Sequence, residues 1–113
     1  MPHPYDVKKS GSAASDGDLV LTSEDVSAAT EHLIRVTDGA VLVEVSIDNG
    51  VTWTDSASFP VAVMKLNSSN PSSWALGIAV GELAVLVGCF DRVRLRADGG
   101  ASAAHMSSYR RFL

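Results

Sequence analysis

Apolar and polar residues alternate along most of this chain with the two-residue period of a β-strand. The segment 40–47, AVLVEVSI, places one set of branched apolar side chains on a single strand face: Val41, Val43, Val45 and Ile47. The segment 90–97, FDRVRLRA, alternates arginines with Val93 and Leu95, which predicts a strand with a polar outer face and an apolar inner face.

The same pattern or a short apolar run recurs between turn residues. The expected strands are 18–22, 32–37, 40–47, 58–66, 74–80, 82–90, 90–97 and 101–109. The pair Asp38-Gly39 predicts a two-residue hairpin between 32–37 and 40–47. Strands spaced about 8–12 residues apart with Gly, Asn and Asp turns predict an all-β antiparallel sandwich or jelly roll over residues 18–109.

The two ends of the chain differ from this domain in composition. Residues 1–17 are rich in Ser, Gly, Pro and Ala without apolar periodicity, which predicts a flexible N-terminal arm. Residues 110–113, RRFL, form a basic C-terminal tail. The chain of 113 residues has the length of one domain, so we expect an arm, one β-sandwich and a tail.

Composition limits the cellular setting and the kinds of partner. No apolar run approaches the roughly 18 residues of a membrane span, and the N-terminus lacks the apolar stretch of a secretory signal. The single Cys89 excludes an intramolecular disulfide, suits a reducing cytoplasm and is expected to be a small core residue. A pI near 5.1 and 6% aromatic residues argue against nucleic acid as a partner.

The stretch 46–53, SIDNGVTW, fits the Asp-box pattern Ser-x-Asp-x-Gly-x-Thr-Trp, which recurs in sialidase propellers. This chain is too short for a propeller of several four-stranded blades. In such a hairpin the aspartate accepts turn amides and the glycine supplies positive φ, so the motif predicts a turn that fixes strand register and carries no catalysis. The expected structural residues are Ser46, Asp48, Asn49, Gly50, Thr52 and Trp53.

Residue patterns for catalysis or metal binding are weak. A glycosidase needs two convergent carboxylates, and only Glu44 and Glu82 lie within strand-like apolar segments, with nothing in the sequence to pair them. His3, His32 and His105 show no metal-ligand spacing. We therefore expect no enzyme activity, no metal and no cofactor.

Charge is distributed unevenly along the chain. Twelve acids and four bases lie before Arg92, whereas five arginines and the single acid Asp98 follow from there onward. Three arginines aligned on one strand face suit a protein contact, because a guanidinium group forms forked bonds to carboxylates. The candidate partner-binding residues are Arg92, Arg94, Arg96, Tyr109, Arg110, Arg111, Tyr5, Lys8 and Lys9.

Two segments together resemble a known group of proteins. VEVSIDNGVTW (43–53) and GCFDRVRLRADGG (88–100) are similar to small jelly-roll virion proteins of tailed bacteriophages, above all capsid decoration (cement) proteins. The resemblance implies a non-enzymatic protein, made in the host bacterial cytoplasm, that sits on the capsid surface. It also implies binding to the major capsid protein or other virion proteins and assembly into a dimer or trimer.

Other functions remain open at this point. The same two segments occur in neck or head-fibre proteins and in tail-fibre modules. Trp53 and Trp74 are also compatible with a carbohydrate-binding sandwich used in host recognition. An enzyme ranks last among these alternatives.

Overall fold

The computed structural model describes residues 7–23, 26, 28–55, 63–66 and 77–110, and all regular structure within these ranges is β. The strands are β1 (Val7–Ala13), β2 (Leu19–Thr22), β3 (Glu31–Asp38), β4 (Ala40–Ser46), β5 (Thr54–Asp55), β6 (Val63–Lys65), β7 (Ile78–Ala79), β8 (Leu83–Val87), β9 (Arg92–Ala97) and β10 (Ser102–Tyr109). β6 and β7 lie within the strands expected at 58–66 and 74–80, of which residues 58–62 and 74–76 lie outside the described residues. Each of the other expected strands has a counterpart here.

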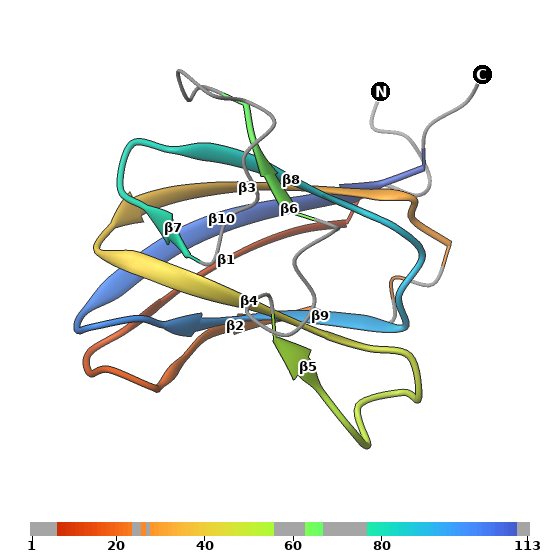
Figure 1. Ribbon diagram of the computed structural model, residues 1–113, viewed down its shortest axis with the longest axis horizontal. Helices are drawn as coiled ribbons and strands as arrows, with labels where there is room; N and C mark the ends of the chain where they lie inside the picture. The colour runs from red at the N-terminus through yellow and green to blue at the C-terminus, as the bar shows by residue number, and fades with distance from the viewer. Residues whose placement is uncertain (1–6, 24–25, 27, 56–62, 67–76, 111–113) are drawn as a thin grey trace.

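The strands form two antiparallel sheets packed face to face (Figure 1). Sheet A has the order β1-β10-β3-β8-β6, and sheet B has the order β2-β9-β4-β5 with β7 also paired to β4. Along the described strands, the chain changes sheet at every step from β1 to β10 except between β4 and β5. With β6 and β7 set aside, the two layers have the strand orders β1-β10-β3-β8 and β2-β9-β4-β5. These are the strand orders of a jelly roll, so the expected fold class is confirmed.

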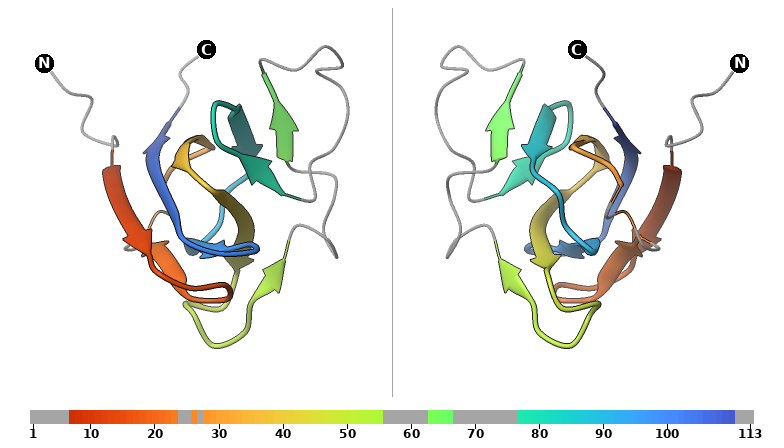
Figure 2. Two further views of the ribbon diagram at one scale, coloured as in Figure 1. Left: turned by 90° about the vertical axis from the view of Figure 1, so that its left-hand side faces the viewer. Right: turned by 90° about the vertical axis from the view of Figure 1, so that its right-hand side faces the viewer.

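The core lies between the two sheets, which curve around it when viewed along the strands (Figure 2). Alternate residues of the central strands point inward and are buried, as the two-residue period requires. The least exposed apolar side chains include Ile34, Val41, Ile78, Val93 and Leu95. Val93 and Leu95 thus point inward as expected, and the arginines between them face outward.

Strand β1 replaces part of the expected arm. Residues Val7–Ala13 pair with β10 over their whole length, from Val7 opposite Ser108 to Ala13 opposite Ser102. The prediction of a flexible arm over residues 1–17 is therefore wrong for residues 7–13. A Cβ on Gly11 would lie 2.0 Å from the carbonyl oxygen of Val20. Gly11, one of the residues that suggested an arm, therefore permits the close approach of β2.

The expected hairpin across Asp38-Gly39 is also wrong. β3 belongs to sheet A and β4 to sheet B, so the chain turns a corner between the layers instead of pairing its two strands. Gly39 has φ 64°, and a Cβ there would lie 2.2 Å from the carbonyl oxygen of Ala101. The same Asp-Gly chemistry serves a hairpin and a corner, so the local sequence did not distinguish them.

The part of the chain that the structure describes contains no helix of the length and apolarity needed to cross a membrane.

Candidate functional site

The predicted Asp-box turn forms between β4 and β5, which pair as a hairpin in sheet B. The Ser46 hydroxyl donates to Asp48 Oδ1 (2.8 Å) and accepts the Gly50 amide (2.8 Å). Asp48 Oδ1 also accepts the Thr52 amide (2.9 Å), and Asp48 Oδ2 accepts the Thr52 hydroxyl. The Trp53 indole N–H donates to the carbonyl of Gly50 (3.1 Å). The side chains of Ser46, Asp48, Thr52 and Trp53 therefore all take part in holding the turn.

These bonds act on the charged form of Asp48. The hydroxyl and amide of Thr52, followed by the hydroxyl of Ser46, lower the pKa of Asp48 to about 2. The carboxylate is thus ionised at neutral pH and occupied by internal donors, which leaves it a poor general acid or base.

The turn is tied to the start of β9. The Asn49 amide donates to Asp91 Oδ2 (2.9 Å), and Arg92 Nε donates to Asn49 Oδ1 (3.2 Å). The Asp91 amide donates to the carbonyl of Ser46 (3.0 Å). Asn49 has φ 61°, a left-handed conformation that asparagine tolerates better than most residues. The turn is therefore held from within and from the neighbouring strand.

Two apolar side chains project from this held turn. Ile47 is 77% exposed and Val51 is 79% exposed. The expectation that Ile47 shares the core face of Val41, Val43 and Val45 is wrong, because β4 ends at Ser46 and the turn rotates the chain. We call Ile47, Val51 and the Asp48–Gly50 backbone between them the tip.

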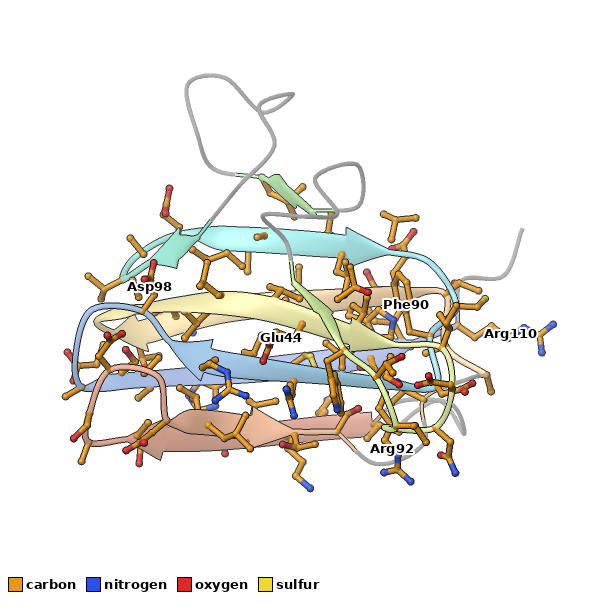
Figure 3. The ribbon with its side chains drawn as sticks, turned by 60° about the horizontal axis from the view of Figure 1, so that its bottom comes forward. Glu44, Phe90, Arg92, Asp98 and Arg110 are labelled. Atoms are coloured by element: carbon orange, nitrogen blue, oxygen red, sulfur yellow. The ribbon has the colours of Figure 1, made fainter. Side chains whose placement is uncertain are left out.

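The arginine stripe lies on the outer face of sheet B, opposite Glu44 of β4 (Figure 3). Arg94 Nε and Arg96 Nε both donate to Glu44 Oε1, at 2.8 and 2.9 Å. Arg96 also donates to the carbonyl of Gly17. Of the three arginines predicted as partner contacts, Arg94 and Arg96 are thus paired with Glu44 across sheet B, and Arg92 is bonded to Asn49 as described above.

Trp53 belongs to the same cluster. The Arg94 guanidinium lies 4.0 Å from the centroid of the indole ring, which is a cation–π contact. A sugar stacking on this face of Trp53 would have to displace the arginine. Trp74, the other tryptophan considered for a sugar platform, lies outside the described residues.

Three of the remaining predicted contact residues, Tyr109, Lys8 and Lys9, lie in strands of sheet A. Tyr109 is half-buried and donates its hydroxyl to Glu31 Oε2 (2.7 Å), and Arg110 follows it as an exposed residue. Lys8 of β1 is exposed and Lys9 is half-buried. Tyr5 and Arg111 lie outside the described residues, so the structure does not place them.

A groove opens on the outer face of sheet A, with a volume of about 320 Å³. Its lining includes the half-buried Leu33 and Leu83 and four basic residues, Lys8, Lys9, Arg35 and His105. Among the described residues, the ion pairs found are those of Glu44 on the opposite sheet, and none involves the basic groups of the groove. Lys8 was expected to contact a partner, whereas Arg35 and His105 were missed because they come from different strands.

His32 is a buried polar residue that the sequence did not single out. Its Nδ1 lies 2.8 Å from the Ser108 hydroxyl, its Nε2 lies 3.1 Å from the carbonyl of Gly88, and its ring contacts Phe90. Burial lowers the pKa of His32 below its ordinary value, and the bond to Gly88 only partly opposes this effect. The neutral ring therefore donates from Nε2 and accepts the Ser108 hydroxyl at Nδ1.

The structure also places Cys89, which was expected in the core. Cys89 is exposed and Phe90 takes the buried position, because the chain leaves β8 at Val87 and the strand alternation stops. Within the described ranges, no three His, Cys, Asp or Glu side chains gather closely enough to hold a metal ion.

These features define a jelly-roll domain with a rigid turn on one layer and a basic groove on the other. No protein-family model matches the chain, and no curated protein sequence matches it. Among solved structures it is similar to the SPBc2 prophage-derived protein YomS, with a TM-score of 0.63 and 10% sequence identity. The similarity covers 96% of this chain and 97% of the other, and at this identity it shows a shared fold.

Proposed function

We propose that this protein is a non-enzymatic structural component of a tailed-phage virion, and specifically a capsid decoration protein that binds and stabilises the shell of the major capsid protein. The observation that carries the proposal is the jelly-roll fold, shared over nearly the whole of both chains with a prophage-derived protein. The two segments resembling cement proteins support it, since one forms the Asp-box turn and the other contributes the Asp91 and Arg92 side chains that hold it.

The side-chain chemistry fits a protein that works through shape. Glu44, a carboxylate considered for catalysis, is bound by Arg94 and Arg96. Asp48 is bound by its own turn. Groups held in this way keep a surface rigid, which lowers the entropic cost of binding a partner. On this proposal the partners are virion proteins, with no cofactor, nucleic acid or membrane involved.

The test is the composition and stability of particles from the phage whose genome carries this chain. We expect the protein in purified capsids at a fixed ratio to the major capsid protein, and we expect capsids made without it to rupture at lower temperature. Adding the purified chain should bind expanded shells and restore their stability. Absence from capsids together with failure to bind shells would overturn the proposal.

The predicted contact residue Arg110 allows a sharper version of this test. Arg110 and Asp98 lie at opposite ends of the sandwich (Figure 3). We expect Arg110→Glu to weaken shell binding and the reversed-charge control Asp98→Lys to retain it, with both variants folded by circular dichroism. Recovery of the protein with isolated tails instead of capsids would contradict the decoration role and favour a fibre module.

A further inference from the structure

The groove on sheet A is built from two cross-strand rows of outward-facing residues. One row runs across β1, β10, β3 and β8 through Ser10, His105, Arg35 and Leu83. The next row runs through Lys8, Ser107 and Leu33. The groove thus combines an apolar floor with basic side chains, a combination suited to an apolar ligand that also carries negative charge.

The tip is complementary to the groove, because it combines exposed apolar side chains with carboxylates. Ile47 and Val51 are the two most exposed large apolar side chains of the described residues. Between and beside them lie the carboxylates of Asp48 and Asp91, with Arg92 as the one cation bonded to this turn. The hydrogen bonds within the turn and to β9 fix its shape before any contact is made.

Tip and groove lie on opposite sides of the molecule. The hairpin of β4 and β5 that carries the tip belongs to sheet B (Figures 1 and 2). The groove is lined by outward-facing residues of β1, β10, β3 and β8, on the face of sheet A that points away from sheet B. A tip therefore cannot reach the groove of its own chain. It can reach the groove of another copy.

We propose that copies of this chain associate head to tail, with the tip of one copy inserted into the groove of the next. Ile47 and Val51 would lie against Leu33 and Leu83, while Asp48 and Asp91 would face the basic groups of the groove. Such a contact joins two different surfaces, so repetition gives a closed ring or an open column according to the rotation between copies.

The size of the contact sets its strength. A turn in a groove buries much less than the ~800 Å² per partner of a standard interface, so a single contact should be weak and concentration-dependent. Closure of a ring, or placement of several copies on a shell, would strengthen it through effective concentration. The inference deepens the proposed function and rests on it for the particle, whereas the association itself is a property of the purified chain.

The test is sedimentation velocity of the full chain across a wide concentration series. We expect the weight-average mass of the wild type to rise with concentration and to pass the mass of a dimer. The double variant Ile47→Ser/Val51→Ser and the groove variant Arg35→Glu should each weaken association at least about tenfold, as expected for losing one buried apolar side chain or charge pair. The control Leu19→Ser/Val80→Ser removes two exposed apolar side chains elsewhere and should associate like wild type.

An equimolar mixture of the tip variant and the groove variant tests whether the tip of one copy meets the groove of another. One variant keeps an intact groove and the other an intact tip, so the mixture should form a complex of two chains that grows no further. A monomeric wild type, a tip variant that associates normally, or a mixture that stays monomeric would each overturn the inference. A monomeric wild type that still binds shells would leave the proposed function standing.

Discussion

His32 connects β3 to both of the strands that flank it in sheet A, β10 and β8. It lies in β3, bonds to Ser108 near the end of β10 and to Gly88 just after β8, and is fully buried. Replacement by alanine removes a buried ring, which costs about 3–5 kcal/mol. It also leaves the buried Ser108 hydroxyl without its partner, which adds about 1–3 kcal/mol. The sum approaches the ~5–15 kcal/mol stability of a whole domain, so we expect His32→Ala to be largely unfolded.

His32→Gln is the informative substitution, because it separates the hydrogen bonds from the titration. A glutamine amide can donate to the carbonyl of Gly88 and accept the hydroxyl of Ser108, so the loss should stay within the ~0.5–3 kcal/mol of an ordinary substitution. The glutamine side chain has no proton to gain between neutral and mildly acidic pH.

The pH dependence follows from the lowered pKa of His32. The unfolded chain binds a proton near the ordinary value of 6.5, whereas the folded chain excludes it until lower pH because the ring is buried. The stability from His32 is therefore fully present above pH 6.5 and is lost as the pH falls below that value. One proton limits this loss to about 1.4 kcal/mol per pH unit.

The assay is urea unfolding, followed by circular dichroism, at a series of pH values from neutral to about 5, the range in which histidine titrates. The free energy of unfolding of the wild type minus that of His32→Gln should fall with decreasing pH below 6.5. A difference between wild type and His32→Gln that does not change with pH would refute the reasoning.

Three further substitutions test other parts of the structure. Gly11→Val should destabilise the protein by about 2–4 kcal/mol in thermal unfolding, because the valine side chain would meet the backbone of β2. The control Ser12→Val, on the exposed face of β1, should change the stability by no more than about 0.5 kcal/mol. Equal effects of the two substitutions would contradict the packing of β1. Glu44→Gln should lower the free energy of unfolding in urea by about 1 kcal/mol, and by less at high salt, because it weakens two partly exposed ion pairs with Arg94 and Arg96. An unchanged urea midpoint would show that these ion pairs add nothing to stability. Asp48→Asn should speed hydrogen exchange at the Thr52 amide, which donates to this carboxylate. In the wild type, the protection of this amide should persist above about pH 4 and fade as the pH drops toward 2, because the stability that comes from a lowered pKa is lost as the folded carboxylate protonates. Fast exchange of the Thr52 amide in the wild type at neutral pH would contradict the turn.

The strands and the Asp-box turn were predictable because their causes are local. The alternation of β9 puts Val93 and Leu95 inside, and the spacing of Ser46, Asp48 and Thr52 places their polar groups within reach of one another in a short turn. The residues at which strands end were harder to predict. The exposure of Ile47 depends on where β4 stops, which the apolar pattern alone does not show.

The candidate surfaces were predicted only in part. The sequence aligned Arg92, Arg94 and Arg96 on one face but did not place Glu44 opposite them on β4, so they looked available when they are paired. The groove was missed because its basic residues are far apart in the chain and meet only when β1, β10 and β3 pair.

The sequence by itself determined a single all-β domain, most of its strands, the outward direction of the arginines and the chemistry of the turn at 46–53, because each depends on residues a few positions apart. Only the tertiary structure decided that Val7–Ala13 is a strand, that Gly39 is a corner between layers, and that the arginines are bound to Glu44. These outcomes depend on which strands become neighbours, and that choice is set by the packing of two whole sheets around one core.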